Sequence, residues 1–348
     1  MKKEEKIKVG ISVGDLNGIG TEVILKTFED NRMLELCTPI IFGSTKILSF
    51  QKKHFNIATN FFGIPTADKA QHGKINVVNI SKEIVNIAYG VSSETVGQFA
   101  IKSFVEGTKA LKEGAIDVLV TAPINKHNVQ SEDFKFPGHT DYLGENLEGD
   151  SLMLMVNGSL RVGLLTDHVA VKDVSETITP ELIEKKVNII YNTLKQDFGI
   201  SKPKIAILGI NPHVGDNGVI GVEDDEVMKP TLEKIKNSGK LVFGPYAADS
   251  FFASSNYKNF DAILAAYHDQ GLIPFKTLSF GQGVNFTAGL NRVRTSPDHG
   301  TAYEIAGKNK ADHNSFKEAV FTGIQIFKSR TDYQQIAKNP LKKQPAKI

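Results

Sequence analysis

Three histidines follow apolar runs of the sequence, and an imidazole nitrogen is a common ligand of divalent metal ions. His168 ends "LRVGLLTDH", His213 ends "KIAILGINPH", and His268 stands near the end of "DAILAAYHD". Short apolar runs predict buried strands, and ligands of open α/β sheets bind beyond the carboxyl ends of strands. The pattern therefore predicts a metal site at one sheet edge. The alternative for each histidine alone is a hydrogen-bonded core or capping residue, since the three form no local metal motif.

Carboxylates accompany these histidines in the sequence. Asp167 precedes His168, Asp269 follows His268, and Asp249 comes after another apolar run in "KLVFGPYAADS". Carboxylates next to metal-binding histidines often orient the imidazole, and they also bind metals themselves. We therefore expect the three aspartates close to the histidines, as supports of the imidazoles or as further ligands.

A second group of polar residues indicates an anion-binding site. "FPGHTDYLG" places His139 and Thr140 at the predicted start of a helix, where backbone N–H groups favour anions. The alternative is that Thr140 only caps this helix. The glycine-rich stretch 274–302 adds three cations and an amide, namely Lys276, Asn285, Arg292 and Arg294. Such side chains suit a phosphate or carboxylate. The alternative, a solvated surface loop, fits less well with the apolar residues interleaved there.

Two further polar stretches follow predicted strands. Lys126 in "TAPINKHNV" contacts either a substrate or only solvent, and its spacing does not decide between them. "GDLNGIGTEV" (14–23) resembles a phosphate-binding turn, but it matches neither G-x-G-x-x-G nor G-x-x-x-x-G-K-[ST]. The sequence therefore supports neither a Rossmann nor a P-loop site. The glycines of this turn either approach a phosphate or only permit a tight strand-to-helix connection.

Alternating strands and helices must position these residues. Strands are expected over 8–14, 39–43, 75–80, 116–123, 204–210, 240–245 and 261–268, and a hairpin over 151–166 around Asn157-Gly158. Helices are expected over 92–114, 179–199 and 223–239. Thr179 and Pro180 are typical of a helix start, and Gly114 and Gly199 of helix ends. This alternation predicts an α/β fold with a mostly parallel sheet.

The composition excludes several classes of protein. The 348 residues are enough for about two domains at roughly 150 residues each. A balance of 41 basic and 39 acidic residues, with no basic patch interleaved with aromatics, argues against nucleic-acid binding. The basic ends, 1–8 and 342–348, are expected to be solvated tails. The single cysteine, Cys37, is expected in the core and fits a reducing cytoplasm. We expect neither a signal peptide nor a membrane span.

Several motifs occurring in one order resemble the 4-hydroxythreonine-4-phosphate dehydrogenase family over about residues 7–330. They are "GDLNGIGTE", "TAPINKHNV", "FPGHTDYL", "NPHVGDNGVIGVEDDE", "GPYAADSFF", "YHDQGLIPFK" and "GVNFTAGLNRVRTSPDHGTAYEIAGKNKAD". The resemblance implies a cytoplasmic homodimer of isocitrate/isopropylmalate dehydrogenase-like fold. Each chain would form two interleaved α/β/α domains with the active site in the cleft between them. Residues 1–135 and 272–348 would form the cofactor side, and residues 136–271 the metal-binding and dimerisation side.

The resemblance also implies roles for individual residues. His168, His213 and His268 match the ligands of one divalent ion (zinc, magnesium or cobalt), drawn from both subunits. The substrate-binding positions match His139, Thr140, Lys276, Asn285 and Arg294. "DHGTAYEIAGK" (298–308) resembles an NAD-binding loop, with His299, Thr301 and Lys308 as cofactor contacts. Asp249, Asp269 and a lysine, taken as Lys276, are the candidates for proton transfer.

The resemblance implies that NAD, or NADP in its place, oxidises 4-phosphooxy-L-threonine. Decarboxylation then gives 3-amino-2-oxopropyl phosphate for pyridoxal 5'-phosphate (vitamin B6) biosynthesis. The alternatives are the related acids 4-phospho-D-threonate and 4-phospho-D-erythronate and, more distantly, a phosphate acetyltransferase-like acyl transfer. The sequence departs from the family at Leu16-Asn17, where Pro-Ala is frequent, and at Thr21, where Pro is frequent. It departs again at Asp167, where a hydroxyl residue is usual, and this adds negative charge beside a presumed ligand.

Overall fold

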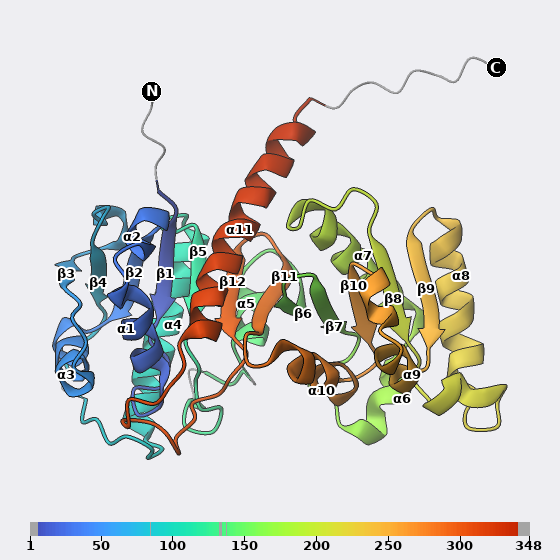
Figure 1. Cartoon of the computed structure of the whole chain (residues 1–348), viewed down its shortest axis with the longest axis horizontal. Helices are drawn as coiled ribbons and strands as arrows, with labels where there is room; N and C mark the ends of the chain where they lie inside the picture. The colour runs from blue at the N-terminus through green and yellow to red at the C-terminus, as the bar shows by residue number, and fades with distance from the viewer. Residues whose placement is uncertain (1–5, 84, 132–133, 137, 340–348) are drawn as a thin grey trace.

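The computed structural model describes residues 6–83, 85–131, 134–136 and 138–339. The basic ends therefore lie outside the described residues, apart from 6–8, of which Lys8 begins the first strand. The described residues form one sheet of 12 strands in the order β3-β4-β2-β1-β5-β12-β11-β6-β7-β10-β8-β9, which runs across the whole molecule (Figure 1). Most neighbouring pairs are parallel, as the alternation of strands and helices predicted.

The strands are β1 (Lys8–Ser12), β2 (Thr38–Gly43), β3 (Phe61–Ile64), β4 (Ile75–Asn79), β5 (Val118–Thr121), β6 (Gly149–Asn157), β7 (Leu160–Leu164), β8 (Lys204–Leu208), β9 (Leu241–Tyr246), β10 (Ala262–Ala265), β11 (Val284–Leu290) and β12 (Val293–Pro297). The α-helices are α1 (Gly20–Glu29), α2 (Met33–Leu36), α3 (Thr45–Phe55), α4 (Glu94–Lys112), α5 (His139–Asn146), α6 (Val174–Thr177), α7 (Pro180–Gln196), α8 (Lys229–Asn237), α9 (Ala248–Ala253), α10 (His268–Ser279) and α11 (Asn314–Ala337). Single turns of 3-10 helix occur at Ala67–Lys69, Val171–Asp173 and Asn256–Asn259, and a π-helical turn at Asp224–Met228 precedes α8. Pro212–Asp216 forms a turn whose interior residues do not have helical φ and ψ angles.

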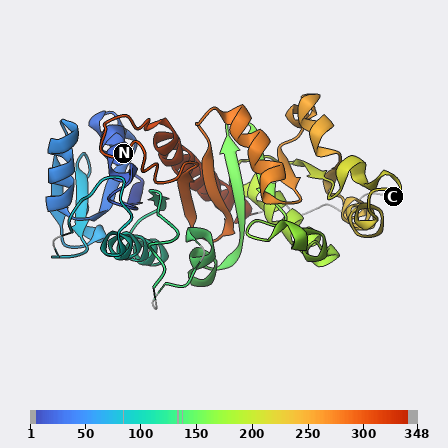
Figure 2. The same ribbon diagram turned by 90° about the horizontal axis from the view of Figure 1, so that it is seen from below.

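Helices cover both faces of the sheet (Figure 2). Successive side chains of a strand point to opposite faces, and β5 shows the result. A Cβ atom at Gly323 of α11 would lie 2.7 Å from Val118, and one at Gly107 of α4 would lie 2.9 Å from Leu119. Both helices therefore approach the sheet so closely that only glycine fits, and the carboxyl end of β5 is held between two packed layers.

Several expected helix signals are present in the structure. Thr179 caps α7 by accepting a hydrogen bond from Leu182 N, and Pro180 is the first helical residue. Gly114 and Gly199 follow α4 and α7 with positive φ angles of 76° and 68°, the conformation in which glycine ends helices. Cys37 is buried, and burial raises the pKa of its thiol to about 12, so it is a core residue as expected.

The glycine-rich stretch 274–302 is not a solvated surface loop, the alternative that its apolar residues already made less fitting. Residues 284–297 form the antiparallel strands β11 and β12 in the middle of the sheet. There β12 pairs in parallel with β5, and β11 pairs in antiparallel with β6. Polar residues alternate along these strands because their side chains point into a pocket, so the strands do not form continuous apolar runs in the sequence. The flanking glycines are typical of a loop.

The sheet includes strands from all three expected segments. Strands β1–β5 lie at one end, β6–β10 lie at the other, and β11 and β12 connect them. The division into two interleaved domains stays a prediction. In the part of the chain that the structure describes, no helix is long and apolar enough to cross a bilayer.

Candidate functional site

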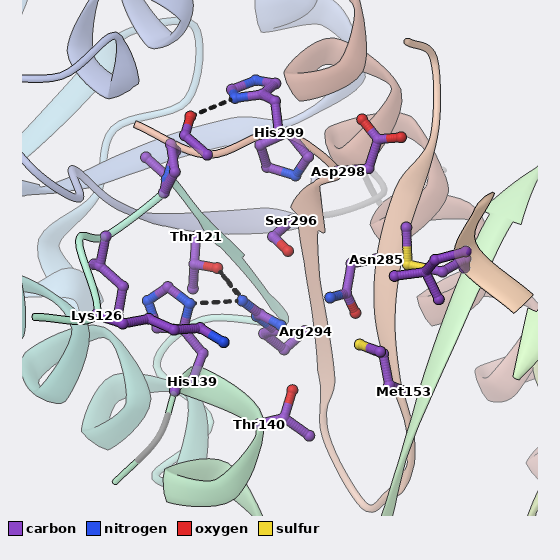
Figure 3. A pocket seen from close by; sticks show the side chains of 18 of the residues that line it. Thr121, Lys126, His139, Thr140, Met153, Asn285, Arg294, Ser296, Asp298 and His299 are labelled. Carbon is purple, nitrogen blue, oxygen red and sulfur yellow. Dashed lines mark hydrogen bonds between the residues drawn. The ribbon is translucent and has the colours of Figure 1, made fainter. Parts of the chain in front are cut away.

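A pocket of about 340 Å³ opens where β5 and β12 end and β11 begins (Figure 3). Its lining comes from the loop after β5, the first turn of α5, strand β6, helix α10, the two central strands and residues 298–300. The two central strands link the halves of the sheet, so the pocket lies between these halves. Carboxyl ends of parallel strands are the usual ligand-binding edge of an α/β sheet.

The pocket collects most of the expected site residues. Its lining includes His139, Thr140, His168, His268, Lys276, Asn285, Arg294 and His299. Five expected residues are not part of the lining, namely His213, Asp249, Asp269, Thr301 and Lys308. All five expected substrate contacts are thus together, whereas the expected metal ligands and cofactor contacts are only partly so.

Arg294 is the most buried charged group of the pocket, with 2% of its surface exposed. Its guanidinium donates to Thr121 Oγ1, to Thr287 Oγ1 at 3.2 Å and to His139 Nδ1 at 2.9 Å. Among the described residues no carboxylate pairs with it. Burial lowers the pKa of Arg294 to about 9, which still leaves it charged at neutral pH. A buried cation without a counterion is costly, so the site is built to receive an anion.

His139 presents a hydrogen-bond donor to the same region. Arginine can only donate, so His139 Nδ1 must accept and the proton of the neutral ring must lie on Nε2. That Nε2 atom is buried, and it has no hydrogen-bond partner among the described residues. Burial, then the charges of Arg294 and Lys126, hold the pKa of His139 well below 6.5. The neutral ring therefore offers one N–H at the start of α5, beside Thr140. The helix begins at His139 after Gly138, so Thr140 is not its cap.

Other pocket residues reinforce the positive character of the site. Lys276 Nζ donates to the Asp298 carbonyl at 3.1 Å, and the buried Asn285 Oδ1 has no hydrogen-bond partner within the described part of the chain. Lys126 reaches the pocket and lies 3.4 Å from His168 Nε2, so it does not merely face solvent. Asp298 is the one carboxylate of the described lining, and burial raises its pKa. The charge balance favours an anionic ligand.

The three strands that precede the histidines are neighbours in the sheet. The order β7-β10-β8 is parallel throughout, so His168, His213 and His268 follow the same edge, as expected. His268 Nδ1 lies 2.7 Å from Asp269 Oδ1. The described residues of one chain nevertheless include no group of three side chains placed to hold a metal ion.

His213 lies in an unusual turn of the chain and is not part of the pocket lining. Residues 213–217 all have positive φ angles, from 44° to 78°, a left-handed conformation that costs non-glycine residues energy. The buried Asp224 carboxylate accepts hydrogen bonds from Ile210 N at 2.8 Å and from Asn211 N at 2.9 Å. It therefore anchors the start of this turn and holds His213 exposed at the surface.

The expected cofactor loop packs against the glycine turn after β1. Ile19 N donates to Thr301 O at 3.0 Å, and a Cβ atom at Gly18 would lie 2.8 Å from that oxygen. The glycines thus serve close packing of two loops. Lys308 donates to Glu304 O and lies outside the pocket. His299 Nδ1 contacts Gly300 O, and no other described residue forms a hydrogen bond with its buried Nε2.

Sequence reasoning missed several residues of the pocket, among them Thr121, Met153, Met155, Ser296 and Asp298. Thr121 ends β5, so the strand-end rule that selected the histidines would have found it. The two methionines and Ser296 carry no such signal, because they lie within strands whose partners are distant in the sequence.

Fold and pocket together define an α/β protein with an anion-binding site at the carboxyl edge of its sheet. Residues 35–322 match the family described as pyridoxal phosphate biosynthetic protein PdxA. The chain is 48% identical over 344 residues to a 4-hydroxythreonine-4-phosphate dehydrogenase of Bacteroides thetaiotaomicron, covering 98% of this chain and 94% of the relative. It is 35% identical over 323 residues to a D-threonate 4-phosphate dehydrogenase of Cupriavidus necator, covering 91% and 96%.

A solved structure of 4-hydroxythreonine-4-phosphate dehydrogenase from Klebsiella pneumoniae superposes with a TM-score of 0.80 at 29% identity, covering 94% of this chain and 99% of that one. A second, from Burkholderia phymatum, gives 0.76 at 33% identity, covering 93% and 99%. The chain belongs to the PdxA family of dehydrogenases and has the isocitrate/isopropylmalate dehydrogenase-like fold. Membership favours the expected oxidoreductase over acyl transfer.

Proposed function

We propose that this protein oxidises 4-phosphooxy-L-threonine with NAD and decarboxylates the product to 3-amino-2-oxopropyl phosphate, a step of vitamin B6 biosynthesis. The observation that carries the proposal is Arg294, a buried guanidinium that no carboxylate of the described residues pairs with, in a pocket that two lysines also line. A substrate with a phosphate and a carboxylate supplies the missing negative charge. The name of the 48% identical relative supports the choice of substrate.

The chain's own residues would bind and orient the substrate. Arg294 and Lys276 neutralise its anionic groups, while His139 Nε2–H and Asn285 supply hydrogen bonds of fixed direction. Because Thr121 and Thr287 hold the guanidinium, little reorganisation is needed when the anion arrives. Such preorganisation brings the reacting carbon to one defined place beside the cofactor.

A metal ion fits part of this site. Asp269 can only accept from His268 Nδ1, which leaves His268 Nε2 free as a ligand, the usual support of a metal-binding histidine. His168 lines the same pocket, and we propose that His213 of a second copy completes the ligand set. A bound divalent ion would polarise the substrate hydroxyl and later the carbonyl oxygen.

Exposed apolar side chains support a homodimer. Ile220 and Val222 are 42% and 45% exposed close to His213, and Ile273 is 64% exposed on α10, the helix that begins at His268. Apolar surface near both histidines is typical of a protein interface. A second copy covering it would bring a histidine to the neighbouring pocket.

We assign cofactor binding to the loop 298–308, with NAD as the hydride acceptor and NADP as the alternative. The buried, unpartnered Nε2 of His299 is an acceptor on the pocket side of this loop. For proton transfer we propose Lys276, because it lines the pocket. Asp249 is exposed on α9 and Asp269 is bonded to His268, so neither faces the substrate directly.

The substrate is tested by comparing kcat/KM for NAD reduction with 4-phosphooxy-L-threonine, 4-phospho-D-threonate and 4-phospho-D-erythronate. We expect the first to be preferred. The names of two relatives at 35% and 36% identity make 4-phospho-D-threonate the second candidate. A preference for it would reassign the substrate and leave the reaction class unchanged.

The shared metal site is tested by mixing two inactive variants. His213→Ala and His268→Ala chains should each lose bound metal and activity. If the ligands come from two copies, mixed dimers regain one intact site, and activity returns to about a quarter of wild type. Activity that stays absent after mixing, or a fully active His213→Ala variant, would contradict this arrangement.

A further inference from the structure

Asp15 is a buried carboxylate in the turn after β1, with none of its surface exposed. No lysine or arginine of the described chain forms an ion pair with it. Three neutral donors satisfy it instead, namely Asn17 N at 2.9 Å, Asn128 Nδ2 at 2.9 Å and Tyr303 OH at 2.6 Å. Burying a carboxylate without a cation is costly, so a reason for its presence is needed.

The donors come from three separate segments. Asn17 belongs to the glycine turn itself, Asn128 to the loop after β5, and Tyr303 to the loop before α11. Two of these segments form walls of the pocket, because one carries Lys126 and the other His299. The Asp15 carboxylate is thus the point at which both walls meet.

The bonding is directional as well as close. A carboxylate only accepts, so the Tyr303 hydroxyl must donate its proton to Asp15 and can then accept from Asn125 Nδ2 at 3.1 Å. Asp15 N also donates to Pro123 O at 2.9 Å. The charge on Asp15 thus fixes the direction of both hydrogen bonds of the Tyr303 hydroxyl, and such networks specify one arrangement of the backbone.

The backbones of these segments approach one another closely. A Cβ atom at Gly90 would lie 2.9 Å from Tyr303 O, and one at Gly14 would lie 2.3 Å from Pro123 O. The loop residues therefore pack backbone against backbone, and the hydrogen bonds to Asp15 add to the apolar packing of these segments in determining their alignment.

We propose that Asp15 is a positioning residue that holds the loops 122–128 and 298–311 together, and so fixes the wall of the pocket on which the dinucleotide binds. The proposal rests on the proposed binding of NAD at residues 298–308. Asp15 does not touch the substrate. It acts through Asn128 and Tyr303, and the loops are aligned before the cofactor arrives.

The test uses two variants of the full-length protein. Asp15→Asn keeps the shape of the side chain and removes its negative charge, so that an amide replaces the carboxylate that accepts from Asn17, Asn128 and Tyr303. Tyr303→Phe removes a single hydroxyl. Both variants should raise the Kd for NADH and the KM for NAD about tenfold, which corresponds to about 1.4 kcal/mol of binding free energy. The Kd is measured by NADH fluorescence, and kcat should change less than either constant. Amide hydrogen exchange without cofactor should accelerate in both loops.

Asp197→Asn is the matched control. Asp197 is another fully buried carboxylate, but it pairs with Arg330 far from the pocket lining. Its variant should lower the Tm while loop exchange and the Kd for NADH stay at wild-type values. A general loss of stability would therefore not imitate the expected result.

Asp15→Asn or Tyr303→Phe protein that folds with wild-type loop exchange and NADH affinity would overturn the proposal. If Asp15→Asn does not fold, Tyr303→Phe alone decides. If the wild-type protein binds no NADH, the proposed cofactor is wrong, whereas the exchange measurement still tests whether Asp15 aligns the loops. The two failures are therefore distinguishable.

Discussion

Replacing Thr121 by valine should weaken catalysis through its effect on Arg294. Thr121 Oγ1 accepts hydrogen bonds from both Nε and Nη2 of Arg294, and the threonine is fully buried at the end of β5. Valine has nearly the same shape and cannot accept. The guanidinium then loses two of its four hydrogen bonds to protein side chains and its fixed orientation.

The size of the effect follows from the two lost bonds. A hydrogen bond to a charged group contributes about 1.5–3 kcal/mol, and its loss in a buried site is only partly recovered by water. We expect a net loss of about 2–3 kcal/mol of transition-state stabilisation, or roughly 30- to 150-fold in kcat/KM for the phosphorylated acid. The KM for NAD should change little, because the Thr121 hydroxyl bonds Arg294 and not the loop proposed to bind the cofactor.

Thr287→Val provides a graded control in the same structure. Thr287 is equally buried, but it accepts a single bond from Arg294 at 3.2 Å. Its loss should cost about 1 kcal/mol, or roughly fivefold in kcat/KM. Initial-rate measurements of NADH formation on both variants would test this order. Equal effects of the two variants, or a fully active Thr121→Val protein, would refute the role given to Arg294.

Three further predictions concern stability and metal binding. The pKa of His139 is held below its unfolded value of 6.5, so the unfolded chain takes up the proton first as pH falls. The contribution of neutral His139 to the free energy of unfolding is complete above about pH 6.5 and is lost as the pH falls below it. Urea titrations at several pH values should show a smaller loss of stability at low pH for His139→Gln than for the wild type. Asp197→Asn leaves Arg330 buried and unpaired and should cost about 3–5 kcal/mol, and an unchanged urea midpoint would contradict this. Asp224→Asn should loosen the left-handed turn and lower the metal content of the purified protein at a fixed ion concentration. Zinc retention equal to that of the wild type would show that the turn does not depend on Asp224.

Much of the fold follows from local patterns in the sequence. Strands β1, β2, β4, β5, β8 and β10 coincide with apolar runs, and α7 begins at the cap that Thr179 and Pro180 indicate. Such elements are set by residues close to one another in the chain. The same rule placed His168 and His268 at the edge where the structure has the pocket.

The central hairpin could not be predicted in the same way. The polar side chains of Asn285 and Arg294 are tolerated in strands because they face the pocket. Arg294 is held there by Thr121 and His139, which precede it by more than a hundred residues. The position of His213 depends on a run of left-handed residues anchored by Asp224. Neither long-range contacts nor strained backbone leave a periodic signal in the sequence.

The stoichiometry of the reaction tests the central proposal most directly. Purified protein with a divalent ion, NAD and 4-phosphooxy-L-threonine should release one carbon dioxide for each NADH formed, and Arg294→Met protein should release neither. Formation of NADH without carbon dioxide would contradict the proposed decarboxylation. The absence of NADH formation with this acid and with both related acids would contradict the assignment of an NAD-dependent dehydrogenase.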